Sequence, residues 1–177
     1  MTEEILEIVN SRGQIIGLAT RVQCYQKGLL HKAVSIFIRN FKGEIFLQKR
    51  SSNKSSFPLH WDLSASEHLK LGESYINGAK RGLQEELGIV VNDLRLIRPV
   101  HRQKNKFIKA GEEIIENELV ELYLGEYNGE VNLDPSEVAN GRFCSQDEIQ
   151  EMINKEKFTP WFLDEWKSEV VCDNIYK

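Results

Sequence analysis

Cysteine is scarce and scattered in this sequence. Cys24, Cys144 and Cys172 are an odd number, stand far apart and form no CxxC pair. This pattern favours reduced thiols over a disulfide framework, because disulfide-stabilised proteins of this size carry paired cysteines and belong to oxidising compartments. We therefore expect a cytoplasmic protein.

Long apolar runs and a surplus of basic residues are also absent. No run approaches the roughly 20 residues that a membrane-spanning helix needs, and the N-terminus MTEEILEIV is acidic rather than signal-like. We therefore expect no membrane partner. The net charge of -4 argues against nucleic acid as the main partner, because a protein that binds the phosphate backbone needs a basic surface. Local lysines and a metal can still supply a positive field for a small phosphorylated substrate.

Nothing in the chain divides it into parts. It has no internal repeat, low-complexity tract or proline-rich linker, and its 177 residues are enough to bury one good core. The apolar and charged fractions are those of a soluble globular protein. We expect a single domain over residues 1–177.

Runs of β-branched and aromatic residues, separated by turn residues, predict most of the strands. The predicted strands span residues 5–9, 14–20, 33–39, 44–50, 61–66, 94–102, 114–127 and 141–144. We expect 33–39 and 44–50 to form a hairpin, and the charged segment 103–113 to be a mobile loop. Helices are predicted after Ser145, as an N-cap, and from Thr159 and Pro160, with proline in the first turn. Strands on both sides of helices indicate a mixed sheet packed between helices.

The segment GESYINGAKRGLQEELGI, residues 72–89, predicts a short helix that is rich in carboxylates and ends at Gly88. At about 100° per residue, one apolar stripe gathers Ile76, Ala79, Leu83 and Leu87. Glu85 and Glu86 then lie on the rim of that stripe and point along the surface. Paired glutamates near a helix end are usually a solvated face. The alternative is a carboxylate group that holds a divalent cation against a diphosphate.

The spacing of this segment resembles the Nudix box, which is a glycine, five residues, Glu, seven residues, and then Arg-Glu-aliphatic-x-Glu-Glu-x-Gly-aliphatic. The positions that agree are Glu73, Arg81, Leu83, Glu85, Glu86, Gly88 and Ile89. Two positions depart from the box. Glu67 stands where the first glycine belongs, and Gly82 stands where a metal-binding glutamate belongs. The resemblance implies an α/β fold, the Nudix-type α/β/α sandwich with a mixed β-sheet.

Outside the box the chain resembles the isopentenyl-diphosphate isomerase branch of that superfamily. The segments that carry the resemblance are LHKA at 30–33, Lys54 followed by FP and Trp61, LSASEH at 63–68, LGES at 71–74, ENE at 116–118 and FTPW at 158–161. The catalytic cysteine of the isomerases falls on Ser66, and one ligand histidine falls on Cys24. A hydroxyl ionises far less readily than a thiol, so the proton-shuttling centre is expected to be lost. Replacement of the glutamate at position 82 is normal in that branch and does not imply a dead enzyme.

Carboxylates supply the expected metal ligands. We expect Glu85 and Glu86 to bind Mg²⁺, with Mn²⁺ as an alternative, because Mg²⁺ prefers oxygen ligands together with substrate phosphates. Glu116 and Glu118 share one face of a predicted strand, where their repulsion favours a cation between them. Glu118 is then a metal ligand and the general base that replaces the residue lost at position 82. An exposed edge strand is the alternative for this pair.

Other site residues follow from the resemblance. It implies metal ligation by His68, and similarly by His31, with a hydrogen-bonded structural histidine as the alternative. Arg50 and Lys54 are expected to contact the diphosphate, although a solvated lysine is an alternative. Trp161 is expected to wall the substrate pocket, with a core position as the alternative. The resemblance also implies a structural pair of Glu73 with Arg81.

These residues predict a Mg²⁺-dependent Nudix hydrolase that cleaves a diphosphate linkage in a small organic substrate, of the nucleoside diphosphate type or related. One alternative is an isopentenyl-diphosphate delta-isomerase. Another is a catalytically silent module that binds a diphosphate. The sequence does not identify the substrate, and it leaves the oligomeric state open, a homodimer included.

Overall fold

The computed structural model describes residues 3–109 and 111–175. The strands in this part of the chain are β1 (Ile5–Val9), β2 (Ile15–Thr20), β3 (His31–Arg39), β4 (Ile45–Arg50), β5 (Trp61–Asp62), β6 (Ala65–His68), β7 (Leu94–Lys109), β8 (Glu112–Glu126) and β9 (Val138–Cys144). The helices are α1 (Arg21–Lys27), α2 (Tyr75–Leu87), α3 (Gln146–Lys155), α4 (Pro160–Trp166) and α5 (Glu169–Ile175).

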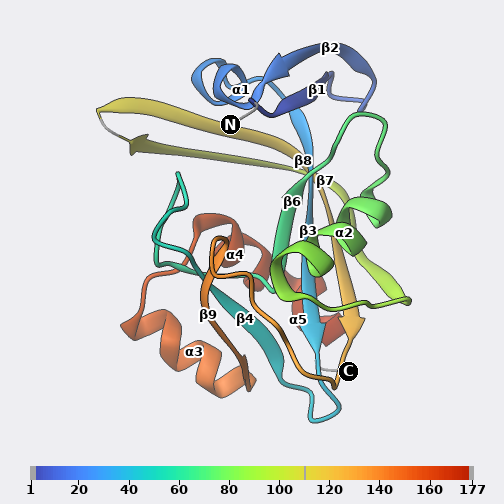
Figure 1. Cartoon of the computed structure of the whole chain (residues 1–177), viewed down its shortest axis with the longest axis vertical. Coiled ribbons are helices and arrows are strands. Elements are labelled where there is room, and N and C mark those ends of the chain that lie inside the picture. Colours follow the sequence, from blue (N-terminus) through green and yellow to red (C-terminus); the bar gives the residue numbers. More distant parts are fainter. Residues whose placement is uncertain (1–2, 110, 176–177) are drawn as a thin grey trace.

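A mixed sheet forms the centre of the molecule (Figure 1). Within the described residues its order is β5-β4-β3-β8-β7, with β6 also beside β3 and β9 also beside β4. Strands β3 and β8 run parallel, whereas the other pairs are antiparallel. The parallel register places His31 directly opposite Glu118. The sheet therefore brings together polar residues that lie far apart in the sequence.

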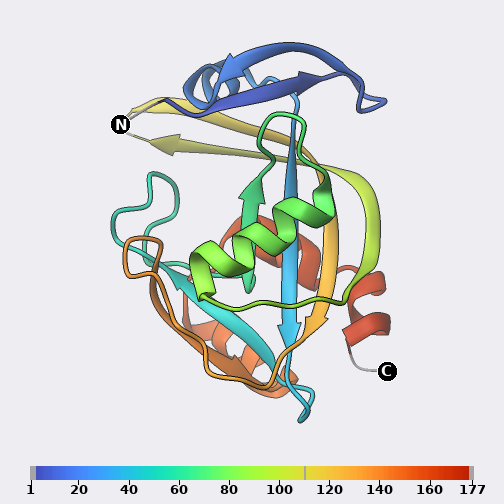
Figure 2. The ribbon, with the colours of Figure 1, turned by 45° about the vertical axis from the view of Figure 1, so that its right-hand side comes forward.

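Helices cover both faces of this sheet. Figure 2 shows α2 crossing in front of β3, and the C-terminal helices lie behind the sheet. One buried cluster joins α2 to β3 through Ala79, Leu83, Leu87, Val34, Ile36 and Ile38. The opposite cluster joins the sheet to α3, α4 and α5 through Phe37, Leu47, Ile149, Phe162 and Val171. Both faces of β3 are apolar and buried, so the expected α/β/α sandwich is confirmed.

Helix α2 forms as predicted, with one correction. Its apolar stripe is buried at Ala79, Leu83 and Leu87 and partly buried at Ile76. Gly88 ends the helix in the left-handed region at φ 64°, where glycine carries no steric cost. Glu86, however, is buried, with an exposed fraction of 2%. The prediction that it points along the surface is wrong, because residues of β4 and β6 cover this side of the helix and contact its carboxylate.

In the described part of the segment 103–113, which leaves out residue 110, the prediction of a loop is wrong. Strands β7 and β8 continue into it and remain paired as far as Lys109 opposite Glu112, and they form a ribbon that projects from the sheet (Figure 1). The prediction failed because this ribbon pairs with itself and has no alternating apolar pattern to mark it as a strand. Phe107 gives it an anchor, since its ring packs 4.7 Å from the ring of Phe57.

Two other strand predictions need correction. The hairpin of 33–39 with 44–50 is present but short: it pairs at Arg39 and Ile45 and at Asn40 and Glu44, because β6 takes the adjoining part of that edge of β3. The predicted strand 61–66 is divided into β5 and β6. The strand 5–9 is present with the predicted ends, and the remaining predicted strands are present with shifted ends.

An N-terminal unit of β1, β2 and α1 lies over the ribbon (Figure 1). Helix α1 was not predicted; Thr20 caps it through a capping box. Cys24 lies in the apolar cluster of this unit, and it and Cys144 are buried free thiols, while the side chain of Cys172 lies outside the described part. No helix in the described ranges has the length and apolar character needed to cross a membrane.

Candidate metal and diphosphate site

A cavity of about 500 Å³ opens beside α2, between the N-terminal unit and α4. His31 is fully buried and is not among the lining residues, but the other residues predicted for the site line the cavity. These residues are Arg50, Lys54, His68, Glu85, Glu86, Glu116, Glu118 and Trp161. They come from six different elements and loops, so the fold gathers them as the resemblance implies.

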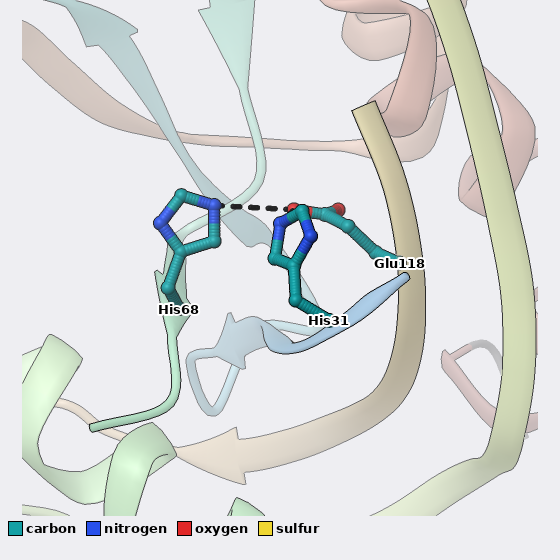
Figure 3. Close-up of side chains that lie close together, drawn as sticks. All are labelled: His31, His68 and Glu118. Atoms are coloured by element: carbon teal, nitrogen blue, oxygen red, sulfur yellow. Dashed lines mark ion pairs between the residues drawn. The ribbon is translucent and has the colours of Figure 1, made fainter. Parts of the chain in front are cut away.

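Two side chains that line the cavity, His68 and Glu118, form a compact imidazole–carboxylate cluster with the buried His31. His31 on β3, His68 on β6 and Glu118 on β8 point toward one another (Figure 3), and their ligand atoms lie within 4.8 Å. Nε2 of His68 lies 3.2 Å from Oε1 of Glu118, and Nε2 of His31 lies 3.4 Å from the same oxygen. Two imidazoles and one carboxylate at this spacing can hold a divalent transition metal.

The tautomer of His31 fits that role. Its Nδ1 lies 2.9 Å from the backbone oxygen of Leu29, which can only accept, so Nδ1 carries the proton. Nε2 is buried and makes no hydrogen bond within the described residues. A second hydrogen bond of this kind, from the far side of the ring, is how proteins orient an imidazole toward a metal. With the proton on Nδ1, Nε2 carries the lone pair that a cation between His31 and Glu118 could accept.

Electrostatics within this cluster are strongly coupled. Burial alone would raise the pKa of Glu118, but the imidazoles of His31 and His68 hold that pKa well below its usual range. Burial disfavours the charged form of His68 and would by itself lower its pKa. Hydrogen bonding to Glu118 and Glu4 outweighs this effect and raises the pKa of His68 to about 9. Glu116 is deprived of water and lies beside the charge of Glu118, so its pKa rises to about 7.

The N-terminal unit supplies residues that sequence reasoning missed. Glu4, Arg21 and Tyr25 all line the cavity. Oε1 of Glu4 lies 3.4 Å from Nδ1 of His68, and the hydroxyl of Tyr25 lies 3.4 Å from Nε2 of the same ring. Cys24, which aligns with a ligand histidine of the isomerases, points instead into the apolar cluster of the unit. No sequence signal marked these residues, because their contacts with β6 depend on long-range folding.

A second group of carboxylates lies on the α2 side of the cavity. Oε2 of Glu86 accepts a hydrogen bond of 2.5 Å from Nε2 of Gln48, and Oε1 accepts a longer one of 3.4 Å from the backbone of Ser66. Burial, and then the negative charge of Glu67, raise the pKa of Glu86 to about 8. Like charges crowded in a buried place are what a bound cation relieves.

Glu67 and Gly82, the two departures from the Nudix box, meet in space. A Cβ atom at position 82 would lie 2.6 Å from Cγ of Glu67, so only glycine leaves room for this side chain. The Glu67 carboxylate lines the cavity and accepts a hydrogen bond of 2.6 Å from Nη1 of Arg81. Sequence reasoning treated the two departures as separate losses. The sequence does contain a signal that links them: the box has glycine at the first position and glutamate at the second, and this chain has Glu67 and Gly82.

Arg81 holds this side of the site together, as the resemblance implied. It donates two hydrogen bonds of 3.0 Å to Glu73, one of 2.8 Å to the backbone oxygen of His68 and one of 2.9 Å to Glu85. The Glu85 side chain is half exposed and also contacts Lys70. Glu85 therefore stands at the rim of the cavity, whereas Glu86 lies inside.

The predicted diphosphate contacts line the cavity but already have partners. Arg50 is buried and bonds to Asp62 and to the backbone oxygen of Ser56. Lys54 forms an ion pair with Glu137. Trp161 is a cavity wall, and its indole nitrogen donates to Asp62.

Comparison with known proteins agrees with this geometry. The NUDIX domain family model matches residues 29–162. The chain is 31% identical over 166 residues to isopentenyl-diphosphate Delta-isomerase 1 of Photorhabdus laumondii, which covers 92% of this chain and 93% of that protein. It is 32% identical over 182 residues to human isopentenyl-diphosphate delta-isomerase 2, over 90% of this chain and 79% of that protein.

Solved structures share the fold at lower identity. DR0079 from Deinococcus radiodurans superposes with a TM-score of 0.74 at 18% identity, over 98% of this chain and 100% of that one. The MutT protein of Methanosarcina mazei Go1 superposes with a TM-score of 0.63 at 22% identity, over 82% of this chain and 95% of that one. The family match and the relatives over 30% identical go further than these likenesses: the chain belongs to the NUDIX domain family, in the branch that contains the isopentenyl-diphosphate isomerases.

Proposed function

We propose that this protein is a metal-dependent Nudix hydrolase that cleaves a diphosphate linkage in a small organic substrate. The observation that carries the proposal is the packing of Glu67 on Gly82. It returns to the cavity a third carboxylate, beside Glu85 and Glu86, in a chain whose box has lost one. Such a group is the oxygen-rich surface that Mg²⁺ and substrate phosphates share.

The residues present fit a divalent cation. Glu86 and Glu67 would hold Mg²⁺, with Glu85 at the rim, because a cation between Glu86 and Glu67 would relieve the repulsion that helps to raise the pKa of Glu86. His31, His68 and Glu118 would hold a second ion, for which imidazole ligands favour Mn²⁺ or another transition metal. A bound ion supplies neutralisation of the charge that builds on the diphosphate and acidifies a water molecule.

The chain itself positions the reactants. Arg50 and Lys54 on the cavity wall would bind non-bridging oxygens of the diphosphate. Glu118 belongs to the imidazole–carboxylate cluster and Glu116 lies beside it, and one of the two would accept the proton of the attacking water. The water oxygen bonds to phosphorus as the bond from phosphorus to the leaving phosphate oxygen breaks. Glu118 was the predicted base; because two imidazoles already engage it, Glu116 is a second candidate for that role.

A phosphate-release assay tests the proposal. Nucleoside diphosphate derivatives and prenyl diphosphates are assayed with Mg²⁺ and with a chelator. We expect phosphate release only with Mg²⁺, and a loss of about 100-fold or more in turnover in Glu86→Gln and in Glu67→Gln. A bound metal ion stabilises the transition state by several kcal/mol, and each 1.4 kcal/mol of activation free energy changes the rate about tenfold. Glu151→Gln, an exposed change on α3, is the matched control. Unchanged turnover in the Glu67→Gln/Glu86→Gln double variant removes the proposal.

Isomerase activity is the second candidate. Two observations favour it: the cluster of His31, His68 and Glu118 is preformed, and the curated relatives carry that name. Ser66 opposes it, since it stands where the resemblance places a cysteine. Isopentenyl diphosphate as substrate separates the two: double-bond migration without phosphate release would replace the hydrolase with the isomerase. If the wild type does not move the double bond and Ser66→Cys does, the pocket fits isopentenyl diphosphate and lacks only the thiol. Binding of diphosphates without either reaction would favour the silent module.

A further inference from the structure

Asp62 is a fully buried carboxylate that the proposed hydrolysis does not use. It lies on β5 with an exposed fraction of 0%. Its Oδ2 accepts a hydrogen bond of 3.0 Å from Nη1 of Arg50. Its Oδ1 accepts bonds of 2.7 Å from Nε1 of Trp161, 2.8 Å from the hydroxyl of Thr159, and 2.9 Å from the backbone of Leu63. A buried charge persists only with such partners.

Two of these partners belong to the cavity wall and come from distant parts of the chain. Arg50 ends β4 and Trp161 lies in the first turn of α4, yet the guanidinium of Arg50 lies 5.3 Å from the centroid of the Trp161 ring. One carboxylate therefore fixes a cation and an aromatic ring against each other. Phe57 packs on the same ring edge-to-face, with ring centroids 5.2 Å apart.

The guanidinium of Arg50 keeps little freedom. Its Nε and Nη2 donate to the backbone oxygen of Ser56 at 3.2 and 3.1 Å, and Nη2 also reaches the hydroxyl of Ser56 at 3.4 Å. Arginine has five N–H donors, and Nη1 uses one of its two on Asp62. The other Nη1 hydrogen has no acceptor within the described residues. An N–H held in place on a cavity wall suits a phosphoryl oxygen, because its orientation is already fixed before binding.

We propose that Asp62 is a positioning residue that holds Arg50 and Trp161 as a preformed wall for the diphosphate end of the substrate. Asp62 affects the affinity for the diphosphate through Arg50. It takes no part in the bond-breaking step, which the carboxylates across the cavity would carry out. The inference rests on the proposed function only in taking a diphosphate as the ligand.

Anchoring of α4 is the competing role, since Asp62 also binds Thr159, the N-cap of that helix. The chain offers a matched control for it. Thr159→Val removes one hydrogen bond from the same carboxylate and weakens the cap, but Thr159 is not a cavity residue. Asp62→Asn is more selective toward Arg50: its oxygen can still accept from Trp161 and Thr159, whereas its NH₂ group replaces Oδ2 and faces the Nη1 donor.

The test is calorimetric binding of methylenediphosphonate, a diphosphate analogue that cannot be hydrolysed, with Mg²⁺. We expect Asp62→Asn to weaken Kd about tenfold, the scale of one charge-assisted hydrogen bond, and Thr159→Val to change it less than about twofold. Adding Asp62→Asn to Arg50→Gln should cost little more, because both changes remove the same contact. In turnover with any substrate found, KM should rise in Asp62→Asn and kcat should hold.

Several outcomes would overturn the inference. They are no binding of the analogue by the wild type, equal losses in Asp62→Asn and Thr159→Val, or additive losses in the double variant with Arg50→Gln. If Asp62→Asn does not fold, hydrogen exchange of the Trp161 indole in the wild type carries the test: slow exchange before and after the analogue supports a preformed wall, and fast exchange in the free protein rejects it. The calorimetric experiment measures binding without turnover. Its outcome can therefore be told apart from a failure of the hydrolase proposal, which is tested by phosphate release.

Discussion

Glu67 fills the space that Gly82 leaves on α2. The distance of 2.6 Å between Cγ of Glu67 and a Cβ atom at position 82 is shorter than side chains tolerate, so the two positions cannot both carry a side chain in this arrangement. Each residue alone departs from the Nudix box, yet their packing puts a carboxylate from β6 where the box expects one from the helix. The two departures are therefore one exchange.

The exchange predicts a reversal experiment. Gly82→Glu alone should crowd a second carboxylate against Glu67, and Glu67→Gly alone should remove one, so each single variant should lose activity. The double variant restores the order of the box and should recover most of the activity, because coupled neighbours show interaction energies of up to about 3 kcal/mol. Phosphate release and Tm are measured for all four proteins. A double variant no better than its weaker single parent would contradict the exchange.

Gln48 should control the metal affinity of the α2 carboxylates. It is buried on β4 and orients Glu86 through the 2.5 Å hydrogen bond. Gln48→Leu keeps the size of the side chain and removes the donor, so we expect Mg²⁺ affinity to fall about 10- to 100-fold, the usual effect of losing a partner that orients a ligand. The measurement is the Mg²⁺ dependence of phosphate release. Gln150→Leu on the exposed side of α3 is the control, and an unshifted Mg²⁺ curve in Gln48→Leu would refute the prediction.

The imidazole–carboxylate cluster should bind a transition metal by itself. After incubation with Mn²⁺ and dialysis, metal content is measured for the wild type, His31→Gln and His60→Gln. We expect His31→Gln to lose the ion, because Nε2 of His31 faces His68 and Glu118 and makes no hydrogen bond within the described residues. His60, whose Nδ1 contacts Pro58 outside the cavity, is the control and should retain it. Equal metal content in all three proteins would show that no ion binds there.

Local patterns predicted the elements that depend on local physics. The apolar spacing of α2 and its stop at Gly88 could be read directly, and so could the N-caps of α3 and α4 at Ser145 and Thr159. The resemblance, which has fixed spacing and so carries three-dimensional information, named residues that lie together in the structure. The chosen carboxylates and His68 line one cavity, and His31 lies beside His68 and Glu118.

What sequence reasoning missed depends on contacts between distant segments. The β7–β8 ribbon is held by backbone pairing, which leaves no apolar period in a charged stretch such as 103–109. Glu67 and Gly82 are separated by a whole turn and most of a helix, so their exchange shows only when β6 packs on α2. Asp62 gave no signal either, since its partners Arg50 and Trp161 stand on different elements. The prediction that Glu86 is exposed was wrong for the same reason: its side chain is exposed on an isolated helix but is buried once β4 and β6 pack against α2.

The pair of Glu73 and Arg81 should make stability depend on pH in the acid range. Arg81 donates two hydrogen bonds to this carboxylate, and these hold the pKa of Glu73 below its ordinary value of 4.5. A carboxyl whose folded pKa lies below its unfolded pKa stabilises the fold fully above the unfolded value, and that stabilisation is lost as pH falls through the folded one. Acid should therefore weaken the wild type more than a variant without this carboxylate.

Glu73→Gln tests this dependence by urea unfolding at pH 7 and near pH 3. At pH 7 we expect the variant to be less stable by about 1–2 kcal/mol, the scale of a paired charge-assisted contact. The difference should shrink as the wild-type carboxylate takes up its proton. Glu113→Gln is the control, because its exposed pair with Lys106 should contribute less than about 1 kcal/mol. A difference between wild type and Glu73→Gln that stays constant from pH 7 to pH 3 would mean that the charge of Glu73 does not stabilise the loop against α2, and that the side chain acts there only through its shape.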